Sequence, residues 1–394
     1  MRAPLVALCL SVAALAGQAP AVSDSRAPFS ALAQLGRQVF FDPSLSASGQ
    51  LSCASCHSPA HAYTSSSGGA APRGGAALDQ APLRTVPSLR YLDHTPRFTR
   101  HFYIEHGEER EDEGPAGGFM LDGRVDSLHA QALLPWLDPA EMGNENLEAL
   151  ARRLRQASYA PLLRQLFGPA LLEQPRPLAA AAALALERFE IEDPSFHPYS
   201  SRYDRFLAGE SSLSEQEQRG LALFIDTRKG NCAECHPNTR GPGGRRPDFT
   251  DYAYRALGVP RNRELSANAR ADFFDLGLCG PRRADLRTET RYCGYFKTPT
   301  LRNSARRSRY FHNGRFATLE QVLEFYAERD SAPQRWYPSA HGRLRKFDDL
   351  PAIYRANVDR SDPPFGRARG DPPALSAAEI TDLAAYLRTL DDAD

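Results

Sequence analysis

Two short cysteine motifs combine residue types that can attach a redox cofactor. Residues 53–57 read Cys-Ala-Ser-Cys-His, and residues 232–236 read Cys-Ala-Glu-Cys-His. This pattern is typical of covalent haem attachment, in which the thiols form thioethers and the following His ligates the iron. The sequence therefore predicts two covalently bound haem c groups. The expected iron ligands are His57 and His236, and the expected attachment residues are Cys53, Cys56, Cys232 and Cys235.

Zinc is the main alternative for two pairs of cysteines. A four-thiolate zinc site usually takes both pairs from within about 20 residues. Here the pairs lie in opposite halves of the chain. Neither a zinc site built across two domains nor a thiol redox site explains why each pair is followed by His. Haem attachment is therefore favoured over both.

The N-terminus and the remaining cysteines indicate export to the periplasm. An apolar run from Pro4 to Gly17 precedes the cleavage-site pattern Ala19-Pro20-Ala21, so residues 1–21 are predicted to be a signal peptide. A retained anchor is the alternative, and no membrane span is expected after cleavage. In an exported protein, Cys279 and Cys293 are expected to form a disulfide, the alternative being two buried free thiols.

Composition and periodicity predict a mainly α-helical protein of two domains. The 394 residues carry 48 basic and 48 acidic side chains, a balance that argues against nucleic acid as the main partner. The Pro/Ser/Tyr-rich stretch 193–202 is the expected boundary between domains at 27–195 and 196–394. Helices are expected over 29–41, 146–167 and 178–189, and after the capping residues Ser214, Thr318 and Ser376.

Two polar stretches are expected to be loops. Residues 65–77 are rich in Ser, Gly and Ala and are predicted to form a surface loop. Residues 105–118 are acidic, and a solvated loop is favoured there over a docking site for a basic partner.

Further motifs resemble the bacterial di-haem cytochrome c peroxidases and their MauG-type relatives. The resemblance covers residues 35–390, and besides the two haem motifs it is carried by residues 35–43, 121–124, 138–142, 204–209, 296–303 and 310–314. It implies two tandem cytochrome c-like haem domains packed against each other. It also implies that hydrogen peroxide is reduced at the N-terminal haem, with electrons entering through the C-terminal haem.

The resemblance also implies a set of residues on the open face of the first haem. Gln131, Pro135 and Glu141 match the spacings of four and six residues in the family pattern. A carboxylate there can move a proton between the two peroxide oxygens. An amide can hold the peroxide, and Pro fills space without a competing donor. The alternative for Glu141 is a surface or helix-terminal carboxylate.

The first haem is expected to be open at rest. Relatives place a His ligand before a motif that reads Thr-Val-Pro-Ser at residues 85–88 here. No His occurs between His61 and His94, and His61 follows His57 too closely to reach the opposite face. We therefore expect a five-coordinate or water-bound iron that needs no reductive activation.

Tyr326 is the expected sixth ligand of the second haem. It lies fourteen residues after His312, where classical relatives have Met and MauG-type relatives have Tyr. No Met occurs after Cys235, which excludes Met ligation from this half. A Tyr ligand favours oxidised iron, whereas Met raises the potential. The alternative for Tyr326 is a core aromatic residue, with His312 or His341 as the ligand.

Two departures from the family concern the region between the haems. Leu121 stands where relatives have Trp, so inter-haem transfer must be slower, direct, or routed through another aromatic residue. Thr85 stands at the Asn position of the family calcium site, and Arg307 and Arg309 occupy its carbonyl positions. Because the two guanidinium groups repel a divalent cation, calcium is expected to be absent or weakly bound.

The sequence thus predicts a periplasmic di-haem peroxidase that takes electrons from a small redox donor protein. One alternative is long-range oxidation of a residue in a protein substrate, as in MauG-type relatives. A second is a non-enzymatic di-haem electron-transfer cytochrome, and a third is a redox or peroxide sensor. The sequence specifies neither the donor nor an oligomeric state.

Overall fold

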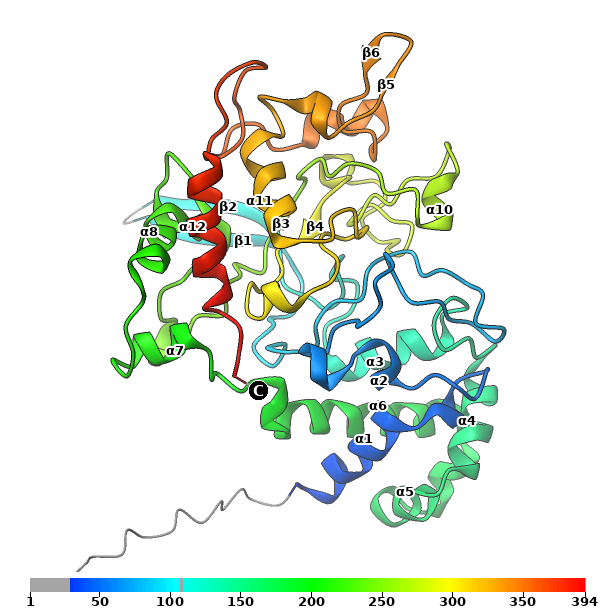
Figure 1. Ribbon diagram of the computed structural model, residues 1–394. Coiled ribbons are helices and arrows are strands. Elements are labelled where there is room, and N and C mark those ends of the chain that lie inside the picture. Colours follow the sequence, from blue (N-terminus) through cyan, green and yellow to red (C-terminus); the bar gives the residue numbers. More distant parts are fainter. Residues whose placement is uncertain (1–28, 107–108, 394) are drawn as a thin grey trace, which may run out of the picture.

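The computed structural model describes residues 29–106 and 109–393, so the predicted signal peptide lies outside the described residues. The protein is mainly helical (Figure 1). The α-helices are α1 (Ala31–Phe41), α2 (Cys53–Cys56), α3 (Leu128–Leu137), α4 (Leu147–Gln156), α5 (Ala160–Phe167), α6 (Pro175–Glu192), α7 (Arg202–Leu207), α8 (Glu215–Ile225), α9 (Cys232–Cys235), α10 (Ser266–Ala269), α11 (Leu319–Glu328) and α12 (Ala377–Arg388). None of the described helices is long and apolar enough to cross a membrane.

The described strands form three small antiparallel pairs. The pairs are β1 (Thr99–His106) with β2 (Glu109–Ala116), β3 (Tyr254–Arg255) with β4 (Phe296–Lys297), and β5 (Ser339–Ala340) with β6 (Arg343–Leu344).

The first half of the chain is organised around the Ala-rich helix α6. This helix packs against α1, α3 and α4 (Figure 1), and its core cluster extends from Leu35 to Phe196. Small side chains allow a close approach, because a Cβ atom at Gly36 of α1 would lie 1.9 Å from the Ala185 carbonyl oxygen of α6. The haem motif of α2 follows α1 directly.

The second half repeats this arrangement with α8 and α12. The two helices lie side by side (Figure 1), and their core cluster extends from Tyr203 to Leu390. A Cβ atom at Gly220 of α8 would lie 2.1 Å from the Asp382 carbonyl oxygen of α12. The haem motif of α9 again follows the first helix. Each half therefore places its CxxCH motif beside a crossed pair of helices.

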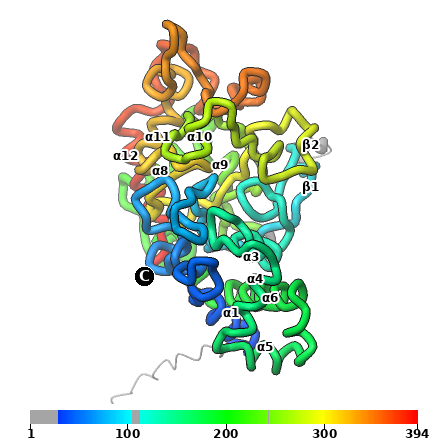
Figure 2. The backbone as a smooth tube through the Cα atoms, turned by 90° about the vertical axis from the view of Figure 1, so that its right-hand side faces the viewer, coloured from blue at the N-terminus to red at the C-terminus, as the bar shows by residue number. Residues whose placement is uncertain are grey.

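The acidic stretch is a β-hairpin rather than the predicted loop. Strands β1 and β2 pair over residues 99–106 and 109–116 and form a hairpin at the edge of the molecule (Figures 1 and 2), and β2 contacts β3 of the second half. Ala116 bridges to Ala253, and Phe98 packs on a third small core cluster that includes Tyr254. The hairpin depends on this contact between halves, which no local pattern in the sequence indicates.

The helix predictions are mostly confirmed, with one break. The helix expected over 146–167 is divided into α4 and α5, because Pro161 begins a new helix after the turn at Tyr159. The predicted capping boxes at Ser214 and Ser376 are present. Thr318 caps α11 through its hydroxyl alone.

The loop at 65–77 is only partly at the surface. Gly74 and Gly75 are buried, and Gly74 lines the cavity beside the first haem motif. A Cβ atom at Gly74 would lie 2.3 Å from the Ala140 carbonyl oxygen. The run of small residues therefore allows the loop to pack under the segment that carries Glu141.

Candidate haem centres

The first candidate centre is a cavity of about 140 Å³ beside α2. Its wall includes all six residues that the sequence assigned to the first haem: Cys53, Cys56, His57, Gln131, Pro135 and Glu141. They come from α2, from α3 and from the turn after α3. The structure therefore brings together residues that lie up to 88 positions apart in the sequence.

His57 is oriented for a ligand. Its Nδ1 atom lies 3.0 Å from the Tyr63 carbonyl oxygen, to which it can donate a hydrogen bond. Burial lowers the pKa of His57 to about 4, so the imidazole is neutral near pH 7. With Nδ1 protonated, Nε2 presents its lone pair. This is the common arrangement of metal-ligating His, in which a carbonyl acceptor fixes the ring and its tautomer.

The second candidate centre has the same arrangement. A cavity of about 230 Å³ is lined by Cys232, Cys235 and His236. The His236 Nδ1 atom lies 2.8 Å from the Phe249 carbonyl oxygen, and burial lowers the pKa of His236. Among the described residues the thiols of both motifs are unpaired, so they are free to form thioethers. Both centres therefore present two thiols and one oriented imidazole to a cavity.

Cationic side chains in the second cavity fit the two propionates of a haem. Lys297 is buried, which lowers its pKa to about 8, and its Nζ donates to the Gly118 carbonyl oxygen at 2.7 Å. Arg307 is also buried, which lowers its pKa, and it forms no ion pair with any carboxylate in the described chain. Both cations donate only to backbone carbonyls and have no ion pair with a described carboxylate. Buried charge without a counter-charge is costly, so an anionic ligand would stabilise both.

Glu141 is enclosed in the first cavity and is suited to proton transfer at neutral pH. Burial and the nearby Asp138 carboxylate raise its pKa to about 7, against the opposing effect of Arg282 and Arg124. Asp138 is paired with Arg282 of the second half at 2.6 Å. A pKa near the working pH is optimal for a group that must both accept and release a proton.

Helix α3 positions Gln131 and Pro135 on the cavity wall. Ser127 caps its N-terminus by accepting from the Ala130 N–H, and Gln131 is buried. Pro135 lies one turn further along and has no N–H to give to the Gln131 carbonyl. Because Pro135 lies inside the helix, no local pattern in the sequence predicts α3.

The first cavity contains no second His. Among its described lining residues His57 is the only His, and His61 is exposed with its Nδ1 atom 3.2 Å from the Ser58 hydroxyl. The thioether side chains Met120 and Met142 do line the wall.

Two lining residues of the first cavity were missed by the sequence analysis. The Trp136 Nε1 and Glu190 Oε2 atoms are buried and have no hydrogen-bond partner in the described structure. Burial and the charge of Glu187 raise the pKa of Glu190 to about 8. Glu190 stands in an Ala-rich helix with no motif around it, so only the packing of α6 reveals it.

Tyr326 on α11 lines the second cavity together with His236. Burial raises its pKa, while the nearby Arg329 opposes this shift. Its ring stacks on Phe365 at 5.4 Å between centroids. No described residue forms a hydrogen bond with its hydroxyl, which leaves the oxygen free for a ligand.

The two competing His residues differ in position. His312 also lines this cavity, with its ring stacked on Phe296 at 3.7 Å. Its Nε2 atom lies 3.5 Å from Asp349 and has no hydrogen-bond partner among the described residues. His341 is exposed between β5 and β6 and does not line the cavity.

Leu121 lines both cavities and lies between them. Its carbonyl oxygen accepts from the Lys297 N–H of β4 at 2.9 Å. Beside it, Arg84 pairs with Asp275 of the second half at 2.6 Å and with Asp122 at 2.8 Å. The two cavities are therefore separated by an aliphatic side chain, which lies next to a buried ionic cluster.

Thr85 and Arg309, which stand at positions of the family calcium site, both donate to backbone carbonyl oxygens. The Thr85 hydroxyl donates to the Phe311 carbonyl oxygen at 2.8 Å, and Arg309 donates to the Gly68 carbonyl oxygen at 3.0 Å. Cys279 and Cys293 form a disulfide.

The chain is similar in sequence to a family of known proteins. Residues 30–212 match the family of di-haem cytochrome c peroxidases. The methylamine utilization protein MauG of Paracoccus denitrificans is 35% identical over 331 residues, which cover 82% of this chain and 79% of MauG. The cytochrome c551 peroxidase of Nitrosomonas europaea is 27% identical over 294 residues, covering 74% of this chain and 72% of the relative.

A solved structure extends the similarity to the fold. The crystal structure of the diheme peroxidase BthA from Burkholderia thailandensis superposes with a TM-score of 0.83 at 38% sequence identity. The match covers 93% of this chain and 87% of BthA. The similarity therefore includes both halves of the chain.

Proposed function

The chain belongs to the family of di-haem cytochrome c peroxidases and MauG, and we propose that it reduces hydrogen peroxide at the cavity of its first half. It is an oxidoreductase that binds haem c covalently, as its family does. The proposed domains are residues 27–195, which hold the peroxidatic haem, and 196–394, which hold the electron-entry haem. The observation that carries the proposal is that Glu141, with its raised pKa, lines the same cavity as His57, and that the described lining residues include no other His.

The proposed chemistry divides between the haem and the chain's own side chains. A haem held by Cys53, Cys56 and His57 would supply the iron that binds peroxide and accepts its oxidising equivalents. The Glu141 carboxylate would accept a proton from one peroxide oxygen and return it to the other, which leaves as water. The Gln131 amide orients the peroxide by hydrogen bonds. Pro135 offers no competing donor at that position.

The second cavity is proposed to hold the haem through which electrons enter. Cys232 and Cys235 would attach it, and His236 and Tyr326, which line the same cavity, would hold its iron. The free Tyr326 hydroxyl and the buried cations Lys297 and Arg307 support this assignment. Reducing equivalents would come from a small redox donor protein. Calcium is proposed to be absent or weakly bound, since Thr85 already donates to a carbonyl.

We place the mature protein in the periplasm. The predicted signal peptide, the two motifs for thioether attachment and the Cys279–Cys293 disulfide support export.

The experiment compares peroxide consumption by two variants of the haem-loaded protein. Glu141→Gln removes the base without changing the shape of the side chain, and we expect a loss of at least about 100-fold in kcat/KM for peroxide. Glu145→Gln alters an exposed carboxylate four residues away and serves as the matched control. Equal activity in both variants would overturn the role of Glu141.

Long-range oxidation of a protein residue is the second candidate function. The 35% identity with MauG and the Tyr at position 326 favour it. Adding peroxide together with a reduced c-type cytochrome separates the two functions. Fast oxidation of the cytochrome supports the peroxidase, whereas peroxide reaction without cytochrome oxidation supports the MauG-like function.

A further inference from the structure

The two expected iron ligands are each hydrogen-bonded to the backbone of an aromatic residue. Both aromatic residues lead, through further contacts, to a polar joint between the halves that is formed by Tyr91, Arg302 and Asp392. The Tyr63 carbonyl oxygen accepts from His57, and the Phe249 carbonyl oxygen accepts from His236. The Tyr63 ring stacks on Phe196 with centroids 3.9 Å apart. The Phe249 ring lies 5.5 Å from the Arg302 guanidinium carbon. Each cavity is thus connected to the joint on the side of its His ligand.

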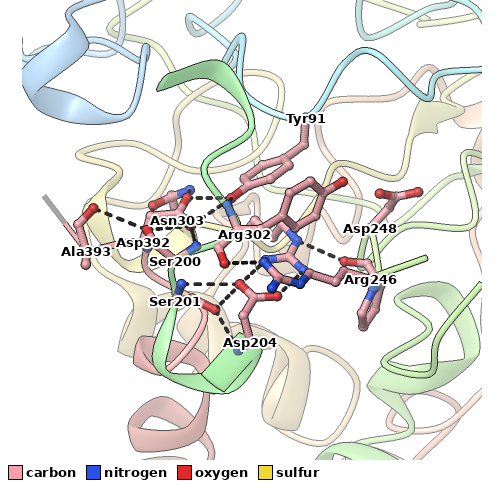
Figure 3. Close-up of polar contacts among 12 residues, drawn as sticks. Tyr91, Ser200, Ser201, Asp204, Arg246, Asp248, Arg302, Asn303, Asp392 and Ala393 are labelled. Atoms are coloured by element: carbon pink, nitrogen blue, oxygen red, sulfur yellow. Dashed lines mark hydrogen bonds and ion pairs between the residues drawn. The ribbon is translucent and has the colours of Figure 1, made fainter. Parts of the chain in front are cut away.

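Tyr91 connects Phe196, on the side of the first cavity, with Arg302, on the side of the second. Its N–H donates to the Phe196 carbonyl oxygen at 2.8 Å. Its ring lies 4.8 Å from the guanidinium carbon of Arg302, which also contacts Phe249. Figure 3 shows Tyr91 and Arg302 together in the polar cluster at this joint. A continuous path of contacts therefore runs from His57 through Tyr91 to His236.

The Tyr91 hydroxyl has a base in position. It is buried and donates to the Asp392 carboxylate, whose two oxygens both lie 2.7 Å away. Asp392 also accepts from Asn303 at 2.6 Å (Figure 3) and from Arg90 at 3.2 Å. Burial and the Asp392 charge raise the pKa of Tyr91, so the phenol is protonated at neutral pH. Its proton would leave only when the ring is oxidised.

The charges around the ring require that proton to leave. Arg302 is fully buried beside Tyr91 and is paired with Asp204 at 2.8 Å. A ring that lost an electron and kept its proton would be a cation beside this guanidinium. Transfer of the proton to Asp392 keeps the ring neutral. The arrangement therefore suits one-electron oxidation coupled to a short proton transfer.

We propose that Tyr91 is a redox relay between the two haem sites, with Asp392 as its proton acceptor. The proposal rests on the proposed function, because peroxide is the oxidant. Reduction of peroxide to two waters at the first site consumes two electrons and two protons. Tyr91 passes these two electrons one at a time, and the two consumed protons come from solvent. Each time Tyr91 gives one electron towards the first site, its phenolic proton moves to Asp392. An electron from the second site then restores the ring, and the proton returns. Leu121 is aliphatic and cannot take part in such a step.

The test follows the haem-loaded protein, with its second haem reduced beforehand, after rapid mixing with one equivalent of peroxide. The first phase, at the first haem, reports the proposed function. The second phase, oxidation of the second haem, reports the relay. Tyr91→Phe is expected to slow only the second phase, by at least about tenfold. Tyr199→Phe is the matched control, because the Tyr199 ring also contacts Arg302 while its hydroxyl has no carboxylate acceptor.

A second phase that is equally fast in Tyr91→Phe and wild type would overturn the relay and leave direct transfer past Leu121. Absence of the first phase in the wild-type protein would contradict the proposed function instead. Wild-type protein gives an independent readout that needs no variant to fold. The second phase should be slower in deuterated water, because a proton moves with the electron. A second phase of equal rate in both solvents would also overturn the proposal.

Discussion

Glu141 shows how one side chain acquires a functional pKa from its surroundings. Its carboxyl is enclosed next to Asp138, and the two cations Arg282 and Arg124 only partly compensate. Sequence spacing identified the residue, but the spacing could not indicate its burial. Glu190, in the same cavity, has no motif and could be found only from the fold.

The pH dependence of the peroxide reaction follows from this pKa. Glu141 must be deprotonated to accept the peroxide proton, and its pKa is raised to about 7. The rate constant for the reaction of the first haem with peroxide should therefore rise between about pH 6 and about pH 8, the range over which a single group with this pKa titrates. Above that range the rate constant should level off. Stopped-flow spectra across this range measure it. A profile with the same rising limb in Glu141→Gln would contradict the assignment.

Tyr326 is expected to set the potential of the second haem. Replacing it with Met offers a ligand that favours reduced iron, so Tyr326→Met should raise the midpoint potential of this haem. Spectroelectrochemical titration provides the measurement. Tyr354→Met is the control, since Tyr354 does not line the cavity. An unchanged potential in Tyr326→Met would favour His312 as the ligand, because it lines the same wall.

At the scale of elements, the crossed helix pairs explain why the haem motifs are placed alike in both halves. In each half a glycine in the first helix allows the last helix to approach, and the CxxCH turn begins shortly after the first helix ends. Periodicity and capping residues predicted α1, α6, α8, α11 and α12, because local patterns determine such helices.

Other elements depend on contacts that local patterns do not encode. Helix α3 contains Pro135, and the hairpin β1–β2 shows no regular apolar alternation. Each is stabilised by packing on residues far away in the sequence. The α3 helix packs on α6, and the hairpin packs near β3 of the second half.

Gly36 tests the helix crossing directly. Gly36→Ala places a methyl group against the Ala185 carbonyl of α6, where a Cβ atom would lie at 1.9 Å. Overpacking of this kind costs about 1–3 kcal/mol, which exceeds the gain of about 1 kcal/mol from replacing helical Gly. Denaturant unfolding should therefore show a lower midpoint. Gly68→Ala, at a position with open space, should leave the midpoint unchanged.

At the scale of the whole molecule, the two halves of the chain contact each other in two distinct regions. One is the short contact at Leu121 between the cavities, beside the ionic cluster of Arg84. The other is the polar joint that contains Tyr91, Arg302 and Asp392 (Figure 3). The sequence indicated that an aromatic bridge is missing at position 121. It could not indicate the joint, whose members come from three distant segments.

The first haem is proposed to have an open face that reacts with peroxide without prior reduction. The most direct measurement adds stoichiometric peroxide to the fully oxidised protein, never exposed to reductant, and records the haem spectrum. Rapid loss of the ferric bands is the predicted result, because His57 is the only His among the described residues of the first cavity wall and Glu141 lies on that wall. An unchanged spectrum, or a reaction that requires prior reduction, would contradict the claim.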